Sequence, residues 1–292
     1  MKTLSFAGDM ARLQQAIAES HDLVVRRGIV LEALNLRPGE RVLELGCGGG
    51  YYTLEAARFV GPRGRVSAID ISPDQIAAAQ ARCAEFAWVE CCEADIAAPP
   101  YGNAEFDVAF AVQALEYLAD LDGALRHIHR MLRPGGKLIV VATDWSAAVW
   151  HSENAPRMHR VLSAFAPHIP CTDLPGILAA RLRRAGIQPL RQTAIPILNN
   201  SYNPASFSYW VAQVIRPFVV SRKSVTEEEA VEWFDELAKL EENGAYFFCI
   251  TPRSDRSSKS ELIGGAHRHV SPVRVQPQRP DRGRRTSSRF SE

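Results

Sequence analysis

Four glycines within five residues mark a candidate ligand-binding loop. They stand at positions 46, 48, 49 and 50 and follow an apolar run that contains Val42, Leu43 and Leu45. The run predicts a buried parallel strand, and the glycines predict a tight loop where the backbone can approach a ligand closely. The residues from Tyr51 to Val60 suit a helix, whose N-terminus would direct free N–H groups toward that ligand.

The spacing of these glycines argues against a dinucleotide. The dinucleotide-binding pattern G-x-G-x-x-G would need glycine at position 51 or 53, where the chain has Tyr51 and Thr53. The pattern that is present, E-x-G-x-G-x-G, runs from Glu44 to Gly50 and places an acid on the strand itself. A purely structural turn after a strand is the alternative interpretation.

A second acid, Asp70, ends the next predicted strand, residues 65–70. It lies 20 residues after Gly50, a spacing typical of an acid that binds a ribose. Its carboxylate could accept hydrogen bonds from both ribose hydroxyls. Since Ser72 and Pro73 supply the cap of the following helix, we expect the Asp70 carboxylate to be free for a ligand.

The glycine pattern and a later string together resemble the class I S-adenosylmethionine-dependent methyltransferases. Motif I of that family is an acid followed by alternate glycines, as in the stretch from Glu44 to Gly50. The string RMLRPGGKL, from Arg130 to Leu138, is similar to the family's element before its fifth strand. The resemblance covers residues 37–143 in order and is greatest to the type-11, ubiquinone/menaquinone methyltransferase-like branch.

This resemblance implies that the cofactor is S-adenosyl-L-methionine. The cofactor-binding residues that it implies are Glu44, Gly46, Cys47, Gly48, Gly50, Asp70, Ile71, Asp95, Ile96 and Gln113. Asp95 follows the third predicted strand, where such enzymes hydrogen-bond the adenine amino group; a solvated loop acid is the alternative. The branch often has Glu-His where this chain has Glu116-Tyr117, so we assign no catalytic base there.

Strands and helices alternate along the chain, which independently predicts a doubly wound α/β fold. The predicted strands are 41–45, 65–70, 87–92, 106–112, 137–143, 188–197 and 246–250. The resemblance makes the last of them antiparallel. We therefore expect a mostly parallel seven-stranded sheet of the Rossmann-like methyltransferase type, with a helical insertion between strands six and seven.

We expect three regions along the chain. Residues 1–36 form two helices that cap the cofactor site, with a plain packing role as the alternative. Residues 37–252 form the methyltransferase domain, within which 198–243 is a helical lid. Residues 253–292 are rich in Arg, Ser and Pro and nearly free of bulky apolar residues, which predicts a disordered basic tail.

Aromatic residues beyond the fifth strand are candidates for binding a methyl acceptor. They are Trp145, Tyr202, Tyr209 and Trp210, although ordinary core positions would also explain each of them. His151 is the only candidate catalytic base, and a surface histidine is the alternative. A base is needed only if the nucleophile carries a proton, because alignment and exclusion of water do the rest.

The composition of this 292-residue chain indicates its cellular compartment and its classes of partner. The N-terminus lacks the apolar core of a signal peptide, and no apolar run reaches the ~18 residues that span a bilayer. The six cysteines show no C-x-x-C pair. We therefore expect a cytoplasmic protein with reduced thiols, no metal site and no membrane partner. Residues 253–292 hold ten Lys/Arg and four Asp/Glu, so the rest of the chain is acidic, which disfavours nucleic acid as a partner.

The sequence thus predicts a methyltransferase that acts on O, N or C of a small, apolar or aromatic metabolite, with no prediction of oligomeric state. A methyltransferase of protein or RNA and a non-catalytic cofactor-binding protein are the alternatives. The first alternative lacks the Asn/Asp-Pro-Pro-Tyr motif after the fourth strand, where this chain has Gln113-Ala-Leu-Glu116. The intact glycine spacing and Asp70 favour cofactor binding but do not separate an enzyme from a binding protein.

Overall fold

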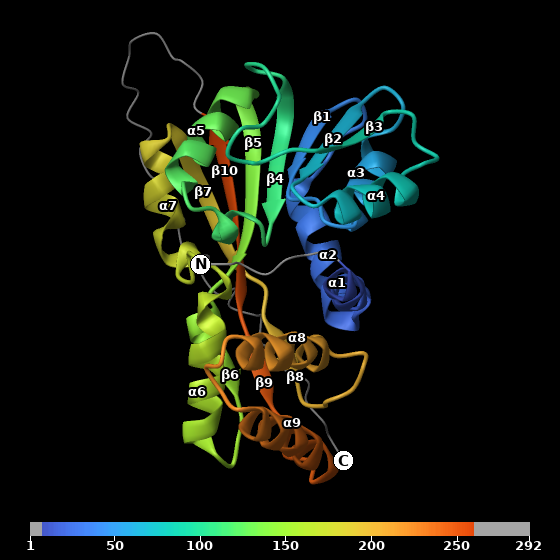
Figure 1. Cartoon of the computed structure of the whole chain (residues 1–292). Coiled ribbons are helices and arrows are strands. Elements are labelled where there is room, and N and C mark those ends of the chain that lie inside the picture. The colour runs from blue at the N-terminus through green and yellow to red at the C-terminus, as the bar shows by residue number, and fades with distance from the viewer. Residues whose placement is uncertain (1–7, 260–292) are drawn as a thin grey trace, which may run out of the picture. The chain divides into compact units, whose positions relative to one another are not determined.

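The computed structural model describes residues 8–259, which are built around a seven-stranded sheet (Figure 1). Across the sheet the strands are β3 (Val89–Glu93), β2 (Arg65–Asp70), β1 (Arg41–Leu45), β4 (Phe106–Val112), β5 (Leu132–Thr143), β10 (Pro252–Lys259) and β7 (Ile187–Ala194). The first five in this order pair in parallel, whereas β10 runs antiparallel to both of its neighbours. The predicted doubly wound, mostly parallel sheet is confirmed.

Helices cover both faces of the sheet because its strands carry apolar side chains on both sides. The helices are α2 (His21–Leu34), α3 (Tyr51–Val60), α4 (Pro73–Arg82), α5 (Leu121–Met131) and α7 (Leu174–Arg184). Val42 and Val108 pack with α2 and α3, whereas Leu43 and Ala109 pack with α5 and α7. Successive residues of a strand point to opposite faces, so one apolar run contributes to both cores.

Two helices precede the first strand, as predicted. They are α1 (Asp9–Glu19) and α2, and Ser20 separates them. Helix α2 ends because Asn35 adopts a left-handed conformation with φ of +44°, and its N–H bonds back to the carbonyls of Leu31 and Glu32. Pro38 follows shortly afterward and prevents the helix from continuing.

A helical subdomain is formed by segments that lie between β5 and β7 and between β7 and β10 in the chain. It consists of α6 (Ala155–Phe165), α8 (Phe207–Ser221), α9 (Glu227–Glu242) and a small sheet of β6 (Val149–Trp150), β9 (Phe248–Ile250) and β8 (Ile197–Asn199). Trp233 and Phe248, both 0% exposed, lie in its core. Thr226 accepts the N–H of Glu229 (3.1 Å) and so caps the N-terminus of α9. Both α8 and α9 fall between β7 and β10 in the chain, where the insertion was predicted.

The seventh strand of the main sheet is not the one that the sequence suggested. Residues 246–250 were expected to form it, but β9 (Phe248–Ile250) pairs only with β6 and β8 in the small sheet. The main sheet is completed instead by β10, which pairs with β5 on one side and β7 on the other. The apolar character of residues 246–250 reflects burial in the helical subdomain.

The predicted start of a disordered tail at residue 253 is therefore wrong. Strand β10 is polar, yet Ser254, Asp255 and Ser257 are at most 5% exposed. Gln192 on β7 donates to the Asp255 carboxylate (3.1 Å), and backbone pairing on both edges satisfies the strand. A composition-based argument fails here because backbone pairing does not depend on apolar side chains. The remainder of the predicted tail, 260–292, lies outside the described residues.

Candidate cofactor and acceptor site

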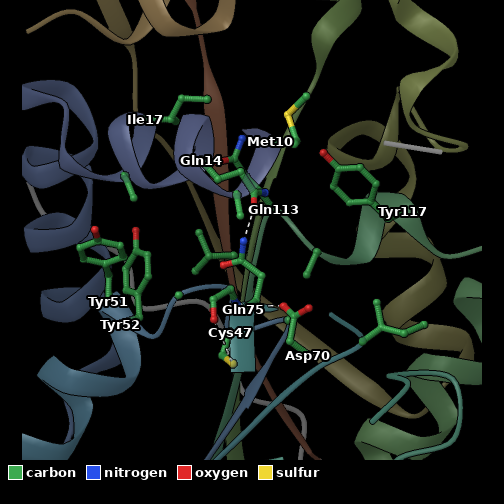
Figure 2. A pocket seen from close by; sticks show the side chains of 18 of the residues that line it. Met10, Gln14, Ile17, Cys47, Tyr51, Tyr52, Asp70, Gln75, Gln113 and Tyr117 are labelled. Carbon is green, nitrogen blue, oxygen red and sulfur yellow. Dashed lines mark hydrogen bonds between the residues drawn. The ribbon is translucent and has the colours of Figure 1, made fainter. Parts of the chain in front are cut away.

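A cavity of about 760 Å³ lies at the carboxyl ends of β1, β2 and β4. The glycine loop after β1, Asp70 on β2 and Gln113 after β4 line it from the sheet (Figure 2). Helices α1, α2, α3 and α4, the segments after β3 and β4, and side chains of or next to the helical subdomain line the rest of it. In open α/β sheets, ligands bind at this edge, where the strand order reverses. Its volume is in the range of small-molecule sites.

The glycine loop is held in a shape that only glycines adopt easily. Gly46, Gly48 and Gly50 have φ of +75°, +50° and +78°. A Cβ on Gly46 would lie 2.5 Å from the Cβ of Ala114, and one on Gly50 would lie 2.8 Å from the Cα of Ala79. The loop therefore leaves no room for side chains at two of its positions, and its backbone can face a ligand directly. Gly48 and Cys47 line the cavity, whereas Gly50 serves as the N-cap of α3.

Asp70 lines the cavity, but its carboxylate is not free, contrary to expectation. One oxygen accepts the N–H of Gly48 (2.9 Å) and the other accepts the N–H of Ser72 (2.9 Å). Asp70 thereby joins the glycine loop to the start of α4. Because a carboxylate offers about four lone-pair positions, two of them remain for a ligand's hydroxyl groups.

Glu44 lies beneath the loop and is 2% exposed. Its Oε2 accepts the hydroxyl of Thr53 (2.5 Å), which ties β1 to the first turn of α3. Burial raises the pKa of the Glu44 carboxyl well above its usual value. Its side chain borders the cavity, and its hydrogen bond indicates that it positions the loop.

A second part of the wall is apolar and lies near the ends of β2 and β3. Ile71 lines the cavity and is 66% exposed, which is unusual for an isoleucine next to a buried strand. Ile96 is also part of this wall and is buried. Asp95 is exposed and accepts the N–H of Ala97 (2.8 Å). These side chains form an apolar surface with a carboxylate at its edge.

Gln113 and Arg26 form a polar pair that the sequence did not suggest. The Arg26 guanidinium, on α2, donates to Gln113 Oε1 (2.6 Å), and Gln113 Nε2 donates to the hydroxyl of Thr143 (2.9 Å). Arg26 is 4% exposed and its Nε has no hydrogen-bond partner within residues 8–259. Arg26 interacts electrostatically with the buried carboxyl of Glu116, and an anionic group of a ligand would be a further partner for the guanidinium. Nothing in the local sequence separates Arg26 from an ordinary helical arginine.

Helix α1 closes one side of the cavity. Gln14 projects from it toward Gln75 on the side of the glycine loop (Figure 2), whereas Ile17 packs against the core of the helical subdomain. Gln75 on α4 donates to Gln14 Oε1 (2.7 Å), and the Tyr51 hydroxyl on α3 donates to Glu19. The N-terminal helices thus contact the cavity.

Aromatic side chains from the helical subdomain form the other end of the cavity. Trp145, which the sequence suggested, lies there with Phe165, His168 and Phe207. The ring centroids of Trp145 and Phe165 are 5.7 Å apart, and those of Trp145 and His168 are 5.2 Å apart. His168 was missed because it follows a proline in a segment with no recognisable motif.

Five predicted residues do not line the cavity: Gly50, the N-cap of α3, and four residues beyond β5. His151 is exposed beyond the end of β6, where its N–H bonds to the carbonyl of Phe247 (2.9 Å). Tyr202 packs against Tyr209, with ring centroids 5.0 Å apart. Trp210 Nε1 donates to the carbonyl of Pro204 (2.7 Å). The aromatic residues of this group belong to the helical subdomain, where they help to bury the apolar faces of its helices.

The comparison with known families agrees with this geometry. Residues 43–140, from β1 to β5, match the family described as "Methyltransferase domain". The domain belongs to the class I S-adenosylmethionine-dependent methyltransferases, type-11 branch. The match covers the glycine loop, Asp70, Asp95 and Gln113, which are the parts of the cavity wall that come from the sheet.

Curated relatives of the methyltransferase domain carry related names. Sterol 4-C-methyltransferase of Caenorhabditis elegans is 32% identical over 114 residues, which are 38% of this chain and 33% of that protein. Demethylmenaquinone methyltransferase of Staphylococcus aureus is 29% identical over 134 residues, which are 46% of this chain and 55% of that protein. The chain therefore spans between a third and about half of the length of the curated relatives that it matches.

Solved structures extend the likeness of the methyltransferase domain to most of the chain. The YcgJ protein of Bacillus subtilis has a TM-score of 0.56 and 17% identity over 82% of this chain and 99% of its own. The 4+2 cyclase SpnF has a TM-score of 0.52 and 21% identity over 81% of this chain and 80% of its own. Because a cyclase shares the fold, the activity has to be argued from the site.

Three features of the described residues concern metal binding, membrane spanning and disulfide bonding. Within residues 8–259, no group of three or more His, Cys, Asp or Glu side chains is arranged to hold a metal ion. No helix in that range is both long and apolar enough to cross a membrane. The cysteines at positions 47, 83, 91, 92, 171 and 249 form no disulfide.

Proposed function

We propose that this chain is an S-adenosylmethionine-dependent methyltransferase whose acceptor is a small, apolar molecule. The observation that carries the proposal is the continuity of one cavity. Its polar end consists of the glycine loop, Asp70 and Arg26, and its apolar end consists of aromatic side chains such as Trp145. A cofactor and an acceptor can therefore meet inside it. When bound, S-adenosylmethionine supplies a methyl group on a positively charged sulfur, which is electrophilic without further activation.

The polar end suits the parts of this cofactor in turn. The crowded Gly46 position brings bare backbone to the ligand, and the Asp70 carboxylate keeps acceptor capacity for ribose hydroxyls. Ile71 and Ile96 offer apolar contact to adenine, with Asp95 at the edge. We assign the cofactor's carboxylate to Arg26, the buried cation whose Nε has no partner in the described part of the chain.

The residues of this chain have three tasks in the proposed reaction. They bind the two reactants, hold the nucleophile in line with the carbon–sulfur bond and keep water away from it. Orientation of this kind can supply about 7–11 kcal/mol of an activation barrier. Helix α1, tied to the loop region through Gln14 and Glu19, and the aromatic wall around Trp145 enclose the space where this alignment would take place.

The nature of the apolar end supports a small acceptor. The curated relatives are named for a sterol and for demethylmenaquinone, both largely apolar molecules. The side chains at this end are Trp145, Phe165, Phe207, Val211 and Val214. Because α1 and the helical subdomain both line the cavity, a loop of protein or RNA would have to displace them to reach the polar end. This arrangement disfavours the macromolecular alternative.

Asp70→Asn is expected to weaken the binding of S-adenosylmethionine by about 10- to 100-fold. Each of two hydrogen bonds to hydroxyls would lose the charge assistance that separates about 1.5–3 kcal/mol from about 0.5–1.5 kcal/mol, so the pair loses about 2–3 kcal/mol, and 1.4 kcal/mol is tenfold in affinity. Isothermal titration of the purified protein measures the change. Asp74→Asn is the control, because it removes the same charge from the cavity wall without touching the loop. Equal losses in both variants would reduce Asp70 to a source of general electrostatic attraction.

The class of acceptor is tested with methyl-labelled S-adenosylmethionine, the purified protein and a cell extract. Label in an organic-soluble fraction is the expected result, since an apolar acceptor stays apolar after methylation. Label in the precipitate would show that the acceptor is protein or RNA. If the protein binds the cofactor but transfers no label, the catalytic part of the proposal is wrong.

A further inference from the structure

His168 is buried at the apolar end of the cavity in an orientation that leaves one ring nitrogen available. Its Nδ1 lies 2.8 Å from the carbonyl oxygen of Phe165. A carbonyl can only accept, so Nδ1 must carry the hydrogen of this bond. In a neutral imidazole the other nitrogen, Nε2, is then a bare acceptor. His168 is 1% exposed although it lines the cavity, so it meets the cavity through a small part of its ring.

Four aromatic rings surround His168, and Phe218 is one of them, with 6.3 Å between ring centroids. His168 stacks on Phe165 with 3.8 Å between centroids and 13° between planes. Trp145 and Tyr117 approach it edge-on at 5.2 and 6.5 Å. Tyr117 lies just after Gln113, whose segment borders the glycine loop through Ala114. His168 therefore contacts Tyr117, and Tyr117 belongs to the chain segment that borders the glycine loop.

The rings that contact His168 carry no charge. They belong to Tyr117, Trp145, Phe165 and Phe218. Burial lowers the pKa of His168 to about 4, so the ring is neutral at physiological pH. The nearby titratable groups are Tyr117, whose pKa burial raises, and Glu116, whose pKa burial raises to about 7. Arg222 lies 4.6 Å from the centroid of Phe218 and is the nearest cation in these contacts.

We propose that His168 is a catalytic base that takes the proton of a neutral hydroxyl group on the acceptor, whose oxygen receives the methyl group. This inference rests on the proposed function and names the acceptor class as an apolar alcohol or phenol. Because Nε2 accepts a hydrogen bond, a ligand that binds to it has to offer a hydrogen-bond donor. A hydroxyl group is such a donor and carries no charge.

The step balances without any further reactant. An oxygen lone pair forms the new bond to the methyl carbon, and the carbon–sulfur bond breaks with its electron pair moving to sulfur. The hydroxyl proton moves to Nε2 of His168 and later passes to solvent. One positive charge leaves the sulfur as one appears on the imidazole, so the net charge of the apolar site is unchanged.

Other acceptor classes fit the surroundings of His168 less well. An alkylammonium group would need a carboxylate beside it, and none of the four contacting rings supplies one. A carboxylate acceptor would have no proton for Nε2 and would need a cation, yet Arg26 is assigned to the cofactor. A neutral hydroxyl satisfies Nε2 and adds no charge to an apolar compartment.

The test compares His168→Gln with the wild-type protein, using methyl-labelled S-adenosylmethionine and an organic-soluble cell extract as the acceptor. We expect His168→Gln to lower the rate by about 10²–10⁴-fold, the usual contribution of a general base, while cofactor affinity stays the same. His151→Gln is the matched control, since that histidine is exposed and away from the cavity, and it should keep the full rate. His168→Phe keeps the ring stack on Phe165 and should show the same loss as His168→Gln.

The pH profile and the product separate the possible outcomes. The wild-type rate should be constant from about pH 5.5 to 8, because a base with its pKa near 4 is already neutral there. The His168→Gln rate should instead rise about tenfold per pH unit as the acceptor ionises in solution. The labelled methyl group should be released by hydriodic acid and not by mild alkali, as in an ether.

Several results would overturn the inference. An unchanged rate in His168→Gln, an equal loss in rate and cofactor affinity, or label on nitrogen or carbon would each refute the role or the acceptor class while leaving the methyltransferase proposal intact. If wild-type protein binds the cofactor and labels nothing, the proposed function and this inference fail together. Retained activity in His168→Phe would show that only the ring stack matters.

Discussion

Glu236→Ala is expected to lower the free energy of unfolding by about 3–5 kcal/mol, the usual cost of breaking a buried ion pair from one side. The Glu236 carboxylate on α9 is 7% exposed. It accepts hydrogen bonds from Arg157 (2.7 Å), the Ser152 hydroxyl (2.7 Å) and the N–H of Glu153 (2.6 Å). Its loss would leave the Ser152 hydroxyl and the Glu153 N–H without this acceptor, and it would leave Arg157 with the exposed Glu232 as its remaining carboxylate. Chemical denaturation followed by circular dichroism measures the change.

Glu232→Ala is the matched control for this variant. Glu232 also accepts a bond from Arg157 at 2.7 Å, but it is 67% exposed. Exposed pairs contribute about 0–1 kcal/mol, so this variant should be close to the wild-type protein. If both variants lose the same small amount, the buried network around Glu236 contributes no more than a surface ion pair.

The same carboxylate also gives stability a predictable dependence on pH. Burial works to raise the pKa of Glu236, but hydrogen bonds from Arg157, Ser152 and backbone N–H groups outweigh it and lower the pKa below 4.5. A lowered pKa means that the stabilisation is fully present above the ordinary value and is lost as the pH falls through the folded-state value. Glu236→Ala should therefore lose less stability on acidification than the wild-type protein.

Gly46→Ala is expected to reduce the affinity for S-adenosylmethionine by about 10- to 100-fold. The new Cβ would lie 2.5 Å from the Cβ of Ala114, and the residue has φ of +75°. Overpacking of this kind costs about 1–3 kcal/mol, and a left-handed conformation costs a non-glycine residue about 1–2 kcal/mol. The loop would have to shift away from the end of β4 to relieve the clash, and its backbone would no longer face the cofactor. Equilibrium binding and thermal denaturation measure both effects.

Gly61→Ala separates backbone strain from crowding. Gly61 has φ of +65°, and a Cβ there would meet nothing within 4 Å in the described part of the chain. It lies after α3, outside the cavity wall. This variant should lose about 1–2 kcal/mol of stability with unchanged cofactor affinity. An affinity loss in Gly46→Ala no greater than that in Gly61→Ala would remove the argument for a close approach at Gly46.

The sheet side of the site could be predicted because its geometry is encoded locally. A glycine loop after an apolar strand, an acid at the end of the next strand and a polar residue after the fourth strand each occupy a fixed place in a parallel sheet. The positions of Gly46, Asp70 and Gln113 follow from that regularity, and all three line the cavity. Sequence spacing is sufficient here since parallel strands end at one edge.

The helical side of the site could not be predicted in the same way. Which aromatic residues face the cavity depends on how α6, α8 and α9 pack on one another, and that is not visible in helical periodicity. Tyr202 and Tyr209 therefore appeared equivalent to Trp145, although only Trp145 lines the cavity. Arg26 and His168 became visible only through burial and hydrogen-bond geometry, since their sequence neighbourhoods carry no motif.

Strand β10 shows a different limit of sequence reasoning. Residues 252–259 lack the apolar character of a buried strand, and only their pairing partners, β5 and β7, identify them as part of the sheet. The Asp255 carboxylate, whose pKa burial raises, is compensated by Gln192 on the adjacent strand. A local pattern cannot reveal a partner more than sixty residues away.

The place of β10 in the sheet also determines the order in which the protein can be assembled. In the main sheet, β7 pairs with β10 and does not pair with β5. Residues 252–259 must therefore be synthesised before β7 can join the sheet. Helices α8 and α9 are synthesised between β7 and β10, and this edge of β5 has no strand partner until β10 is made. Pairing of β5 with β10 closes a loop of more than one hundred residues, which is a slow, non-local event. Newly made chains therefore pass through a stage in which β5 is an open edge strand, and a chaperone that shields such edges would raise the yield of folded protein.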